Sequence, residues 1–258
     1  MAVCPARMDH PGSPIAGTAW GLLPRLAADG ERQMALDRWM LAAVGQQGLP
    51  PALLRFYSWT SPTVSLGRHQ RLAPASAPAG LAVVVRPSGG AAVLHGGDLC
   101  YALALAAPPK GQRRSYVATT RWLQQAMNRL ERQLQPGSAP QAAGQPHCFA
   151  TATAADLLDE GGDKRIGSAQ LWSRGRLLQH GSIQLQPPVE LWRQLFGDDP
   201  PPPQAWPLAA STLADHLEAA AAVDLFGRQP LVLPLPAPDE SGRAAMLRAM
   251  EARENPIG

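Results

Sequence analysis

Lysine is scarce in this chain of 258 residues. Lys110 and Lys164 are the only lysines among 23 basic residues, and the other 21 are arginine. Arginine carries its charge on a bulky planar group, whereas lysine is a compact and adaptable donor. A position that needed only a surface cation would be expected to carry arginine, like almost every other basic position here. Lys164, between turn glycines and a segment of small residues, is therefore the first candidate for chemistry.

Cysteine is rare as well, and its positions form no recognisable metal motif. Cys4, Cys100 and Cys148 are odd in number and widely spaced, without a CxxC pair or a Cys/His ligand spacing. Structural zinc sites need such spacings, and disulfide frameworks use even numbers of cysteines. We therefore expect a reduced protein without a metal site.

Long apolar runs and clusters of like charge are also missing. The longest apolar stretches, such as EAAAAVDLF, are much shorter than the ~20 residues that span a bilayer. The first residues, MAVCPARMDHPGSP, lack the apolar segment of a signal peptide. The net charge is +3 and no run of five basic residues occurs, which argues against nucleic acid binding. We expect a soluble cytoplasmic protein that binds no membrane and no nucleic acid, with a mildly basic face that suits an acidic protein.

The two common nucleotide motifs, GxxxxGK[ST] and GxGxxG, do not occur. Three other glycine-bearing segments stand out, each beside His95, Lys164 or His180: VRPSGGAAVLHGGD, DKRIGSAQ and LLQHGSI. A glycine pair after a strand lets the backbone approach a ligand closely, because no Cβ intervenes. A plain hairpin turn is the alternative for any single pair. Three such segments beside chemically active side chains favour a binding site.

Hydrophobic spacing predicts an α+β domain. A helix is expected at 31–44, ended by Gly45, and a second from about Ser115 to Leu134. Short apolar runs between turns predict strands at 53–59 and 63–67 as a hairpin, at 81–86, 91–95 and 99–106, and two strand pairs within 150–186. Further helices are expected at 189–196, 212–225 and 241–253. This order favours a mixed, mostly antiparallel sheet flanked by helices.

Five segments in a fixed order resemble the lipoate-protein ligase and octanoyltransferase superfamily: RFYSWTSPTVSLGRHQ, VRPSGGAAVLHGGDLCYAL, CFATATAADLL, DKRIGSAQLW and LQHGSI. The resemblance covers roughly residues 30–190. It implies the catalytic fold that this superfamily shares with biotin protein ligases, a class II synthetase-like domain. We expect a flexible N-terminus at 1–18, the catalytic domain at 19–190, and a helical extension of the same domain at 191–258.

The resemblance also implies an acyl-chain pocket. RPSGG and AAVLH would form its wall and floor, Lys164 takes the place of the family's essential lysine, and GSAQ and HGS would line the opposite side. For His95 and His180, lining the pocket and capping a turn are both open. The substrate-binding residues implied are Arg86, Ser88, Gly89, Gly90, His95, Gly167, Ser168, Ala169, Gln170, His180 and Gly181.

Cys148 distinguishes the two branches of the superfamily. The CF segment resembles that of the cysteine-dependent, Gram-positive-type octanoyltransferases, which hold the acyl group as a thioester. Lys164 nearby would favour the thiolate and stabilise the tetrahedral intermediates. The alternative is that Cys148 is a small buried side chain. Asp156 is expected to orient its loop or bind a backbone amide, and Cys100 to lie in the core.

Two positions depart from the transferase pattern. Ala91 replaces the arginine that usually follows the paired glycines, and Val85 replaces the first of two successive arginines, leaving Arg86 alone. Both changes remove cations that could contact a phosphate. The identity of the acyl donor is therefore less firmly indicated than the fold.

The resemblance implies an acyltransferase, with Cys148 and Lys164 as catalytic residues. It would move octanoyl, or lipoyl, from acyl carrier protein to a lysine of the lipoyl domains of 2-oxoacid dehydrogenases or of the glycine-cleavage H protein, without a cofactor. One alternative is a lipoate-protein ligase that uses ATP and magnesium to form lipoyl-adenylate. The other is an inactive relative that binds a lipoyl domain or an acyl chain.

Overall fold

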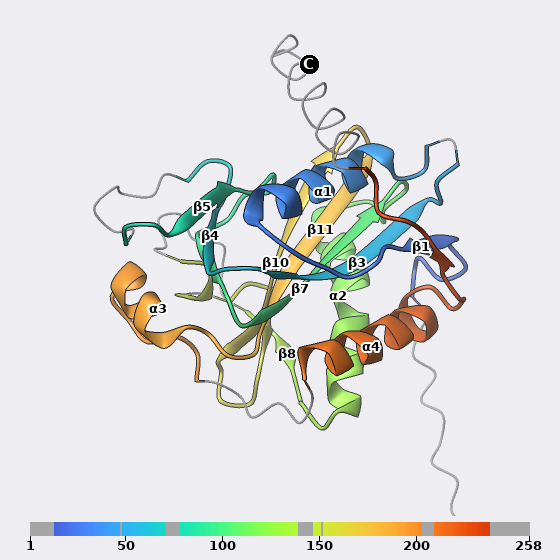
Figure 1. Cartoon of the computed structure of the whole chain (residues 1–258). Helices are drawn as coiled ribbons and strands as arrows, with labels where there is room; N and C mark the ends of the chain where they lie inside the picture. Colours follow the sequence, from blue (N-terminus) through green and yellow to red (C-terminus); the bar gives the residue numbers. More distant parts are fainter. Residues whose placement is uncertain are drawn as a thin grey trace, which may run out of the picture.

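A mixed, mostly antiparallel sheet of nine strands forms the centre of the molecule (Figure 1). The computed structural model describes residues 13–46, 48–70, 78–138, 147–150, 152–202 and 209–237. Eight strands follow one another in the order β12-β1-β3-β7-β11-β10-β9-β8, and β2 pairs with β3. Their bounds are β1 Trp20–Leu22, β2 Leu26–Ala28, β3 Ala52–Trp59, β7 Asp98–Leu105, β8 Gln135–Pro136, β9 Leu157–Leu158, β10 Lys164–Ser173, β11 Arg176–Gln184 and β12 Leu231–Val232.

A second, smaller sheet lies beside the first. It contains β4 (Thr63–Leu66) between β5 (Ala82–Val85) and β6 (Val93–His95). The hairpin expected from 53–59 and 63–67 is wrong, because β3 and β4 belong to different sheets. Pro62 fixes its own backbone and disfavours a helical turn at Ser61. The chain therefore crosses from one sheet to the other.

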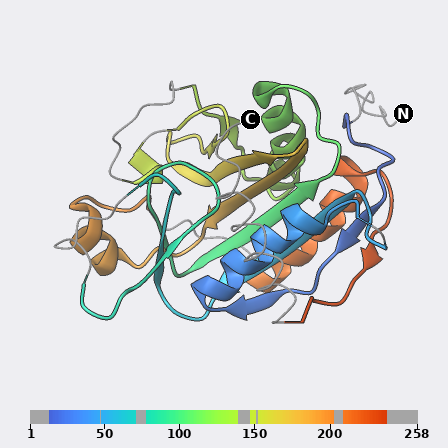
Figure 2. The same cartoon turned by 90° about the horizontal axis from the view of Figure 1, so that it is seen from above.

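Helices cover both faces of the large sheet (Figures 1 and 2). The helix α1 (Gly30–Ala43) packs on one face, and α2 (Gln112–Arg129) packs on the other with α4 (Ala210–Ala220) and the π-helical turn η3 (Ala221–Leu225). The helix α3 (Val189–Phe196) contacts the small sheet, and η2 (Cys148–Ala150) is a short 3-10 turn. The fold class expected from the sequence is confirmed.

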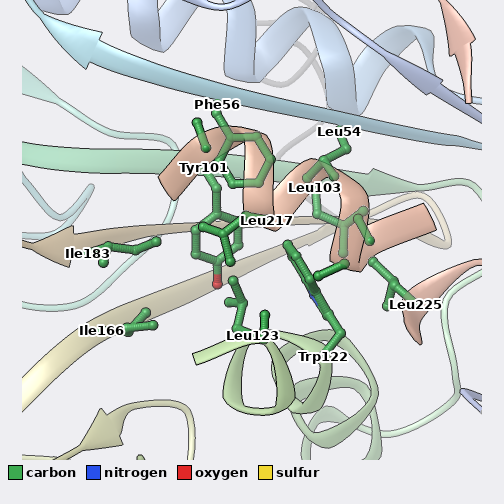
Figure 3. Close-up of a cluster of buried hydrophobic side chains, with 14 of the residues drawn as sticks. Leu54, Phe56, Tyr101, Leu103, Trp122, Leu123, Ile166, Ile183, Leu217 and Leu225 are labelled. Atoms are coloured by element: carbon green, nitrogen blue, oxygen red, sulfur yellow. The ribbon is translucent and has the colours of Figure 1, made fainter. Parts of the chain in front are cut away.

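The main core lies between the large sheet and the helices α2 and α4 (Figure 3). Side chains alternate along each strand: Leu54 and Phe56 of β3 point into this core, whereas Leu53 and Tyr57 belong to the α1 side. Each large side chain buried in this way stabilises the fold by about 1.5–3 kcal/mol. The sheet is thus anchored from both faces, which fixes the strand that carries Lys164.

The expected helices agree well with those observed. The helix α1 begins after Asp29, whose side chain accepts a hydrogen bond from the backbone N–H of Arg32. The helix α2 begins at Gln112, earlier than expected, and ends at Arg129, so the expectation that it continues to Leu134 is wrong. Glu131 has a φ of 58°, which is outside the range of a right-handed helix. The helices expected at 189–196 and 212–225 are confirmed. The helix expected at 241–253 lies outside the described residues.

The segment expected to precede the domain is described only from residue 13. Within it, Ile15 is buried in the main core, and the backbone N–H of Gly17 donates to the carbonyl oxygen of Phe226. Over the described parts of the chain, no helix combines the length and apolar character needed to cross a bilayer.

Candidate active site

Cys148 and Lys164 lie side by side where the two sheets meet. The Nζ atom of Lys164 is 3.3 Å from the Sγ of Cys148 and donates a 2.7 Å hydrogen bond to the carbonyl oxygen of the same residue. The backbone N–H of Cys148 donates to the carbonyl oxygen of Ala92 at 2.8 Å. The segment after the paired glycines therefore holds the cysteine, and the first residue of β10 supplies the lysine.

Asp156 fixes the lysine from the other side. Its Oδ1 is 3.0 Å from Lys164 Nζ and accepts the backbone N–H of Ser168, while its Oδ2 accepts both the N–H and the hydroxyl of Thr153. Both side chains are almost fully buried, at 3% and 4% exposure. The expectation that Asp156 binds a backbone amide is confirmed. Its ion pair with Lys164 was not foreseen.

Two glycines let the strands approach the site closely. A Cβ on Gly167 would lie 3.0 Å from Cε of Lys164 and 3.6 Å from Sγ of Cys148. A Cβ on Gly181, which pairs with Ser168 in the β10–β11 ladder, would lie 2.4 Å from the ring of Tyr101 and 2.7 Å from the carbonyl oxygen of Gly167. Larger residues at these positions would crowd the thiol and push the strands apart.

Arg86 holds the loop with the paired glycines in shape. Its guanidinium donates to the carbonyl oxygens of Ser65, Gly89 and Ala91 at distances of 2.6 to 3.2 Å. Gly90 has a φ of +94°, which favours glycine. Burial lowers the pKa of Arg86, and the nearby Cys148 opposes this effect. The hydrogen bonds of Arg86 thus stabilise a backbone turn beside the thiol.

His180 belongs to a buried chain of hydrogen bonds that extends to Asp37 on α1. The hydroxyl of Ser88 is 2.5 Å from Nε2 of His180, and Nδ1 of His180 is 2.7 Å from Oδ2 of Asp37. Arg55 donates to Oδ1 of the same aspartate at 2.5 Å. Burial raises the pKa of Asp37, but Arg55 and His180 outweigh it and lower the pKa overall. This Ser-His-Asp order does not make a nucleophile of Ser88, because its side chain is completely buried.

His95, on β6 of the small sheet, belongs to a second buried chain of hydrogen bonds. Nε2 of His95 lies 2.8 Å from the hydroxyl of Ser65, and Nδ1 lies 2.7 Å from Oδ2 of Asp98. Burial raises the pKa of Asp98, but His95 and hydrogen bonds from Ser182 and Cys100 lower it to about 2. His95, Asp98 and Cys100 offer ligand atoms within 4.8 Å of one another. The 2.7 Å and 3.1 Å separations within this group are those of hydrogen bonds, so these residues satisfy one another.

Two hollows adjoin the cysteine, and Cys148 lines both. The outer cleft has a volume of about 190 Å³, and the inner pocket is narrow, about 40 Å³. Of the residues expected to bind substrate, the cleft is lined by Arg86, Gly89, Gly90, Ser168, Ala169 and Gln170, together with Lys164. The inner pocket is lined by Arg86, His95, Gly167, Ser168, Ala169, His180 and Gly181. Ser88 lines neither hollow.

Several residues at the site were not predicted from the sequence. Asp37 could have been noticed, because it lies on the apolar face of its helix with Met34 and Met40. An acidic residue at such a position needs a buried partner. Ser65 and Asp98 carry no comparable signal, since serine and aspartate near turns are common.

His147 lines the outer cleft and contacts α3 and the residues that follow it. Its Nε2 is 2.8 Å from a carboxylate oxygen of Asp198, and its ring contacts Trp192 and Phe196. The ring of Phe149 on the other side of Cys148 lies 5.2 Å from Lys164 Nζ. The two aromatic neighbours thus hold the cysteine between α3 and the lysine.

Two known proteins are similar in sequence to this chain over about two thirds of its length. The chain is 32% identical to octanoyltransferase LipM of Oceanobacillus iheyensis over 187 residues, which are 69% of this chain and 68% of that protein. It is 35% identical to octanoyltransferase LipM of Symbiobacterium thermophilum over 193 residues, 69% of this chain and 70% of the relative.

Solved structures share the fold at lower identity. Lipoate-protein ligase A bound with ATP superposes with a TM-score of 0.70 at 16% identity, covering 89% of this chain and 93% of that one. A bipartite lipoate protein ligase from Thermoplasma acidophilum has a TM-score of 0.69 at 15% identity, covering 89% and 91%. Residues 29–226 match the family described as the lipoyl protein ligase A/B catalytic domain. The chain therefore belongs to the lipoyl protein ligase A/B catalytic domain family.

Proposed function

We propose that this protein is an octanoyltransferase that moves an octanoyl group from a carrier thioester to a lysine of an acceptor protein through an acyl-Cys148 intermediate. The observation that carries the proposal is the 3.3 Å contact between Cys148 Sγ and Lys164 Nζ in the cleft. An adenylate-forming ligase has no use for a thiol at this position. The octanoyltransferase relatives, similar over two thirds of their length, support the same conclusion.

In the first half-reaction, the thiolate of Cys148 attacks the carbonyl carbon of the donor thioester. The Lys164 ammonium stabilises the oxyanion that forms and donates a proton to the departing carrier sulfur. The C–S bond to the carrier breaks, the carrier leaves as a free thiol, and Lys164 is left as a neutral amine. Asp156 keeps this side chain directed at the sulfur throughout.

In the second half-reaction, the neutral amine of the acceptor lysine attacks the acyl-Cys148 carbonyl carbon. Lys164 takes the proton that the attacking nitrogen loses, and the C–S bond to Cys148 breaks as the amide forms. The cysteine returns as a thiolate beside an ammonium. Protons balance over the cycle, and neither ATP nor a metal enters it.

The acyl chain is proposed to occupy the inner pocket, with its carbonyl group in the outer cleft. His95, His180 and Gly181 would then contact the chain, while Gly89, Gly90 and Gln170 would lie near the thioester. The lining of the pocket is mostly apolar, which suits an alkyl chain. The acceptor is proposed to be a lipoyl domain or the glycine-cleavage H protein.

Mass spectrometry after mixing with octanoyl-acyl carrier protein tests the proposal. We expect an octanoyl adduct on the peptide that contains Cys148, and its loss on addition of an acceptor domain. The Cys148→Ala variant should form no adduct and lose at least about 10³-fold in transfer rate, whereas Cys4→Ala, a position outside the described residues, should behave as the wild type. Full activity of Cys148→Ala, or pyrophosphate release from ATP with free octanoate, would overturn it.

A further inference from the structure

All the charged side chains of helix α2 are positive. Its 18 residues, Gln112–Arg129, include four arginines and no aspartate or glutamate. Two of them, Arg113 and Arg114, lie in the first turn, where the helix dipole disfavours cations. The N-cap is Gly111, which makes no side-chain hydrogen bond there. Helix stability therefore does not explain why these arginines are placed at this end.

A groove of about 830 Å³ runs along the same helix. The exposed side chain of Val117 lies within it, between Arg114 and Arg121, at the spacing of one helix face. Val223 of η3 forms part of the opposite wall and is 71% exposed. An apolar strip with a charged border is the usual composition of a surface that binds another protein.

The positive charge of the groove is not neutralised within the part of the chain that the structure describes. The groove is lined by four basic residues that form no ion pair with any described residue: Lys110, Arg113, Arg114 and Arg121. Asp224 also lines it, but its carboxylate pairs with Arg129 at the far end of α2. The groove is thus suited to an acidic surface.

A further hollow of about 660 Å³ links the groove to the outer cleft, because it shares Arg113 and Arg121 with the groove and Gln112 and Tyr116 with the cleft. Gln112 and Tyr116 of α2 line the cleft with Cys148 and Lys164. Arg113 lines both the groove and the hollow that links it to the cleft. A protein bound along the groove would therefore sit beside the cleft and leave its opening free.

From this arrangement we infer that the groove along α2, bordered by Lys110, Arg113, Arg114 and Arg121, docks the acyl donor, an acidic protein that carries its acyl group as a thioester on a flexible arm. This inference rests on the proposed function. The donor suits the lateral position because a flexible arm can bridge the step from groove to cleft. An acceptor lysine lies on its own protein's surface, so that protein must cover the cleft opening itself.

Two donors that differ only in the carrier test the inference. Acylation of Cys148 is measured with octanoyl-acyl carrier protein and with octanoyl-N-acetylcysteamine, a small thioester that has no protein surface. For the triple variant Arg113→Glu, Arg114→Glu, Arg121→Glu we expect KM for the carrier to rise at least about tenfold, less so at high salt, with no change for the small thioester. Acidic residues in the first turn favour α2, so unfolding is not expected to mimic the effect.

Arg193→Glu serves as the control for charge. Arg193 is an exposed arginine on α3, which lies apart from α2 in both views (Figures 1 and 2). This variant should acylate normally with both donors. An equal loss with both donors in the triple variant, a loss confined to transfer to the acceptor, or no loss at all would each overturn the inference. Failure of the wild type to acylate with either donor would instead reject the proposed function.

Discussion

Lys164 is held by oxygen atoms from two separate segments, the carbonyl oxygen of Cys148 and the carboxylate of Asp156. A lysine side chain normally has several accessible rotamers, and fixing it in one of them has an entropic cost of about 1.5–2 kcal/mol. Here that cost is met on folding, before the substrate binds. In the proposed mechanism, the ammonium is therefore already in position when charge develops on the acyl oxygen.

The Asp156→Asn variant tests the positioning of Lys164 while leaving the fold intact. The amide oxygen can still accept the N–H of Thr153 or Ser168, but the ion pair with Lys164 is lost. We expect kcat for acylation of Cys148 to fall about 10- to 100-fold, with little change in KM, in rapid-quench measurements. Asp159→Asn makes the same chemical change at a residue that pairs with Arg165, and should leave kcat near that of the wild type. Equal rates in both variants would contradict the role of Asp156.

Asp98 should make stability depend on pH at acidic values. Its pKa is about 2 in the folded protein, against an ordinary value of 3.8. Because the unfolded chain takes up the proton first, stability is complete above about pH 4 and is lost as pH falls toward 2. The shift corresponds to about 2 kcal/mol. Urea unfolding of the wild type between pH 5 and pH 2 should show this decline. The Asp98→Asn variant should have a lower free energy of unfolding at pH 5, and this free energy should depend less on pH.

The two side chains that meet in the cleft, Cys148 and Lys164, could be singled out from the sequence, whereas the buried residues behind them could not. Lys164 was conspicuous because lysine is so rare, and Cys148 because of its sequence context. Asp37 and Asp98 act through histidines that are 143 and 3 residues away in sequence. Only folding brings the more distant pair together, so spacing along the chain could not reveal it.

At the scale of elements, two glycines of the β10–β11 pair allow close packing beside the site: Gly167 against Lys164 and Cys148, and Gly181 against Tyr101. Gly181→Ala would place a Cβ 2.4 Å from the Tyr101 ring and 2.7 Å from the Gly167 carbonyl oxygen, whereas a Cβ on Gly89 would meet no atom within 4 Å. We expect Gly181→Ala to lower stability by about 1–3 kcal/mol, measured as a fall in Tm. Gly89→Ala should leave Tm nearly unchanged while slowing acylation, because it lines the cleft. A similar Tm for the two variants would contradict this account.

The strands were easier to predict than their partners. Apolar runs located most of β3 to β7, because local side-chain pattern reflects the burial of each strand. Pairing depends on contacts between segments far apart in sequence, and β3 joins β7 and not β4. The pocket depends on the pairing of β3 with β7, because this pairing leaves β4 and β6 in a second sheet that faces β10 and β11 across the pocket.

At the scale of the molecule, the segment after residue 190 completes two cores. Trp192 of α3 packs against the small sheet, while Leu213, Leu217 and Leu225 are fully buried in the main core. We propose on this basis that residues 191–258 extend the catalytic domain and do not form a separate one.

A chain that ends at residue 190 tests this proposal. Loss of four large buried side chains, at about 1.5–3 kcal/mol each, removes most of the 5–15 kcal/mol that stabilises a typical domain. We therefore expect the shortened chain to show no cooperative unfolding transition in circular dichroism, in contrast to the full chain. A sharp transition for the shortened chain would show that residues 191–258 are a separate unit.

The shortage of lysine has a final consequence for an enzyme that makes lysine amides. In the proposed mechanism, the acyl thioester on Cys148 can react with any amine that reaches it, including those of the enzyme itself. Lys164 is buried and paired with Asp156, which leaves Lys110 as the one exposed lysine side chain. Because its other basic side chains are arginine, the protein offers a single exposed lysine as a target for self-acylation.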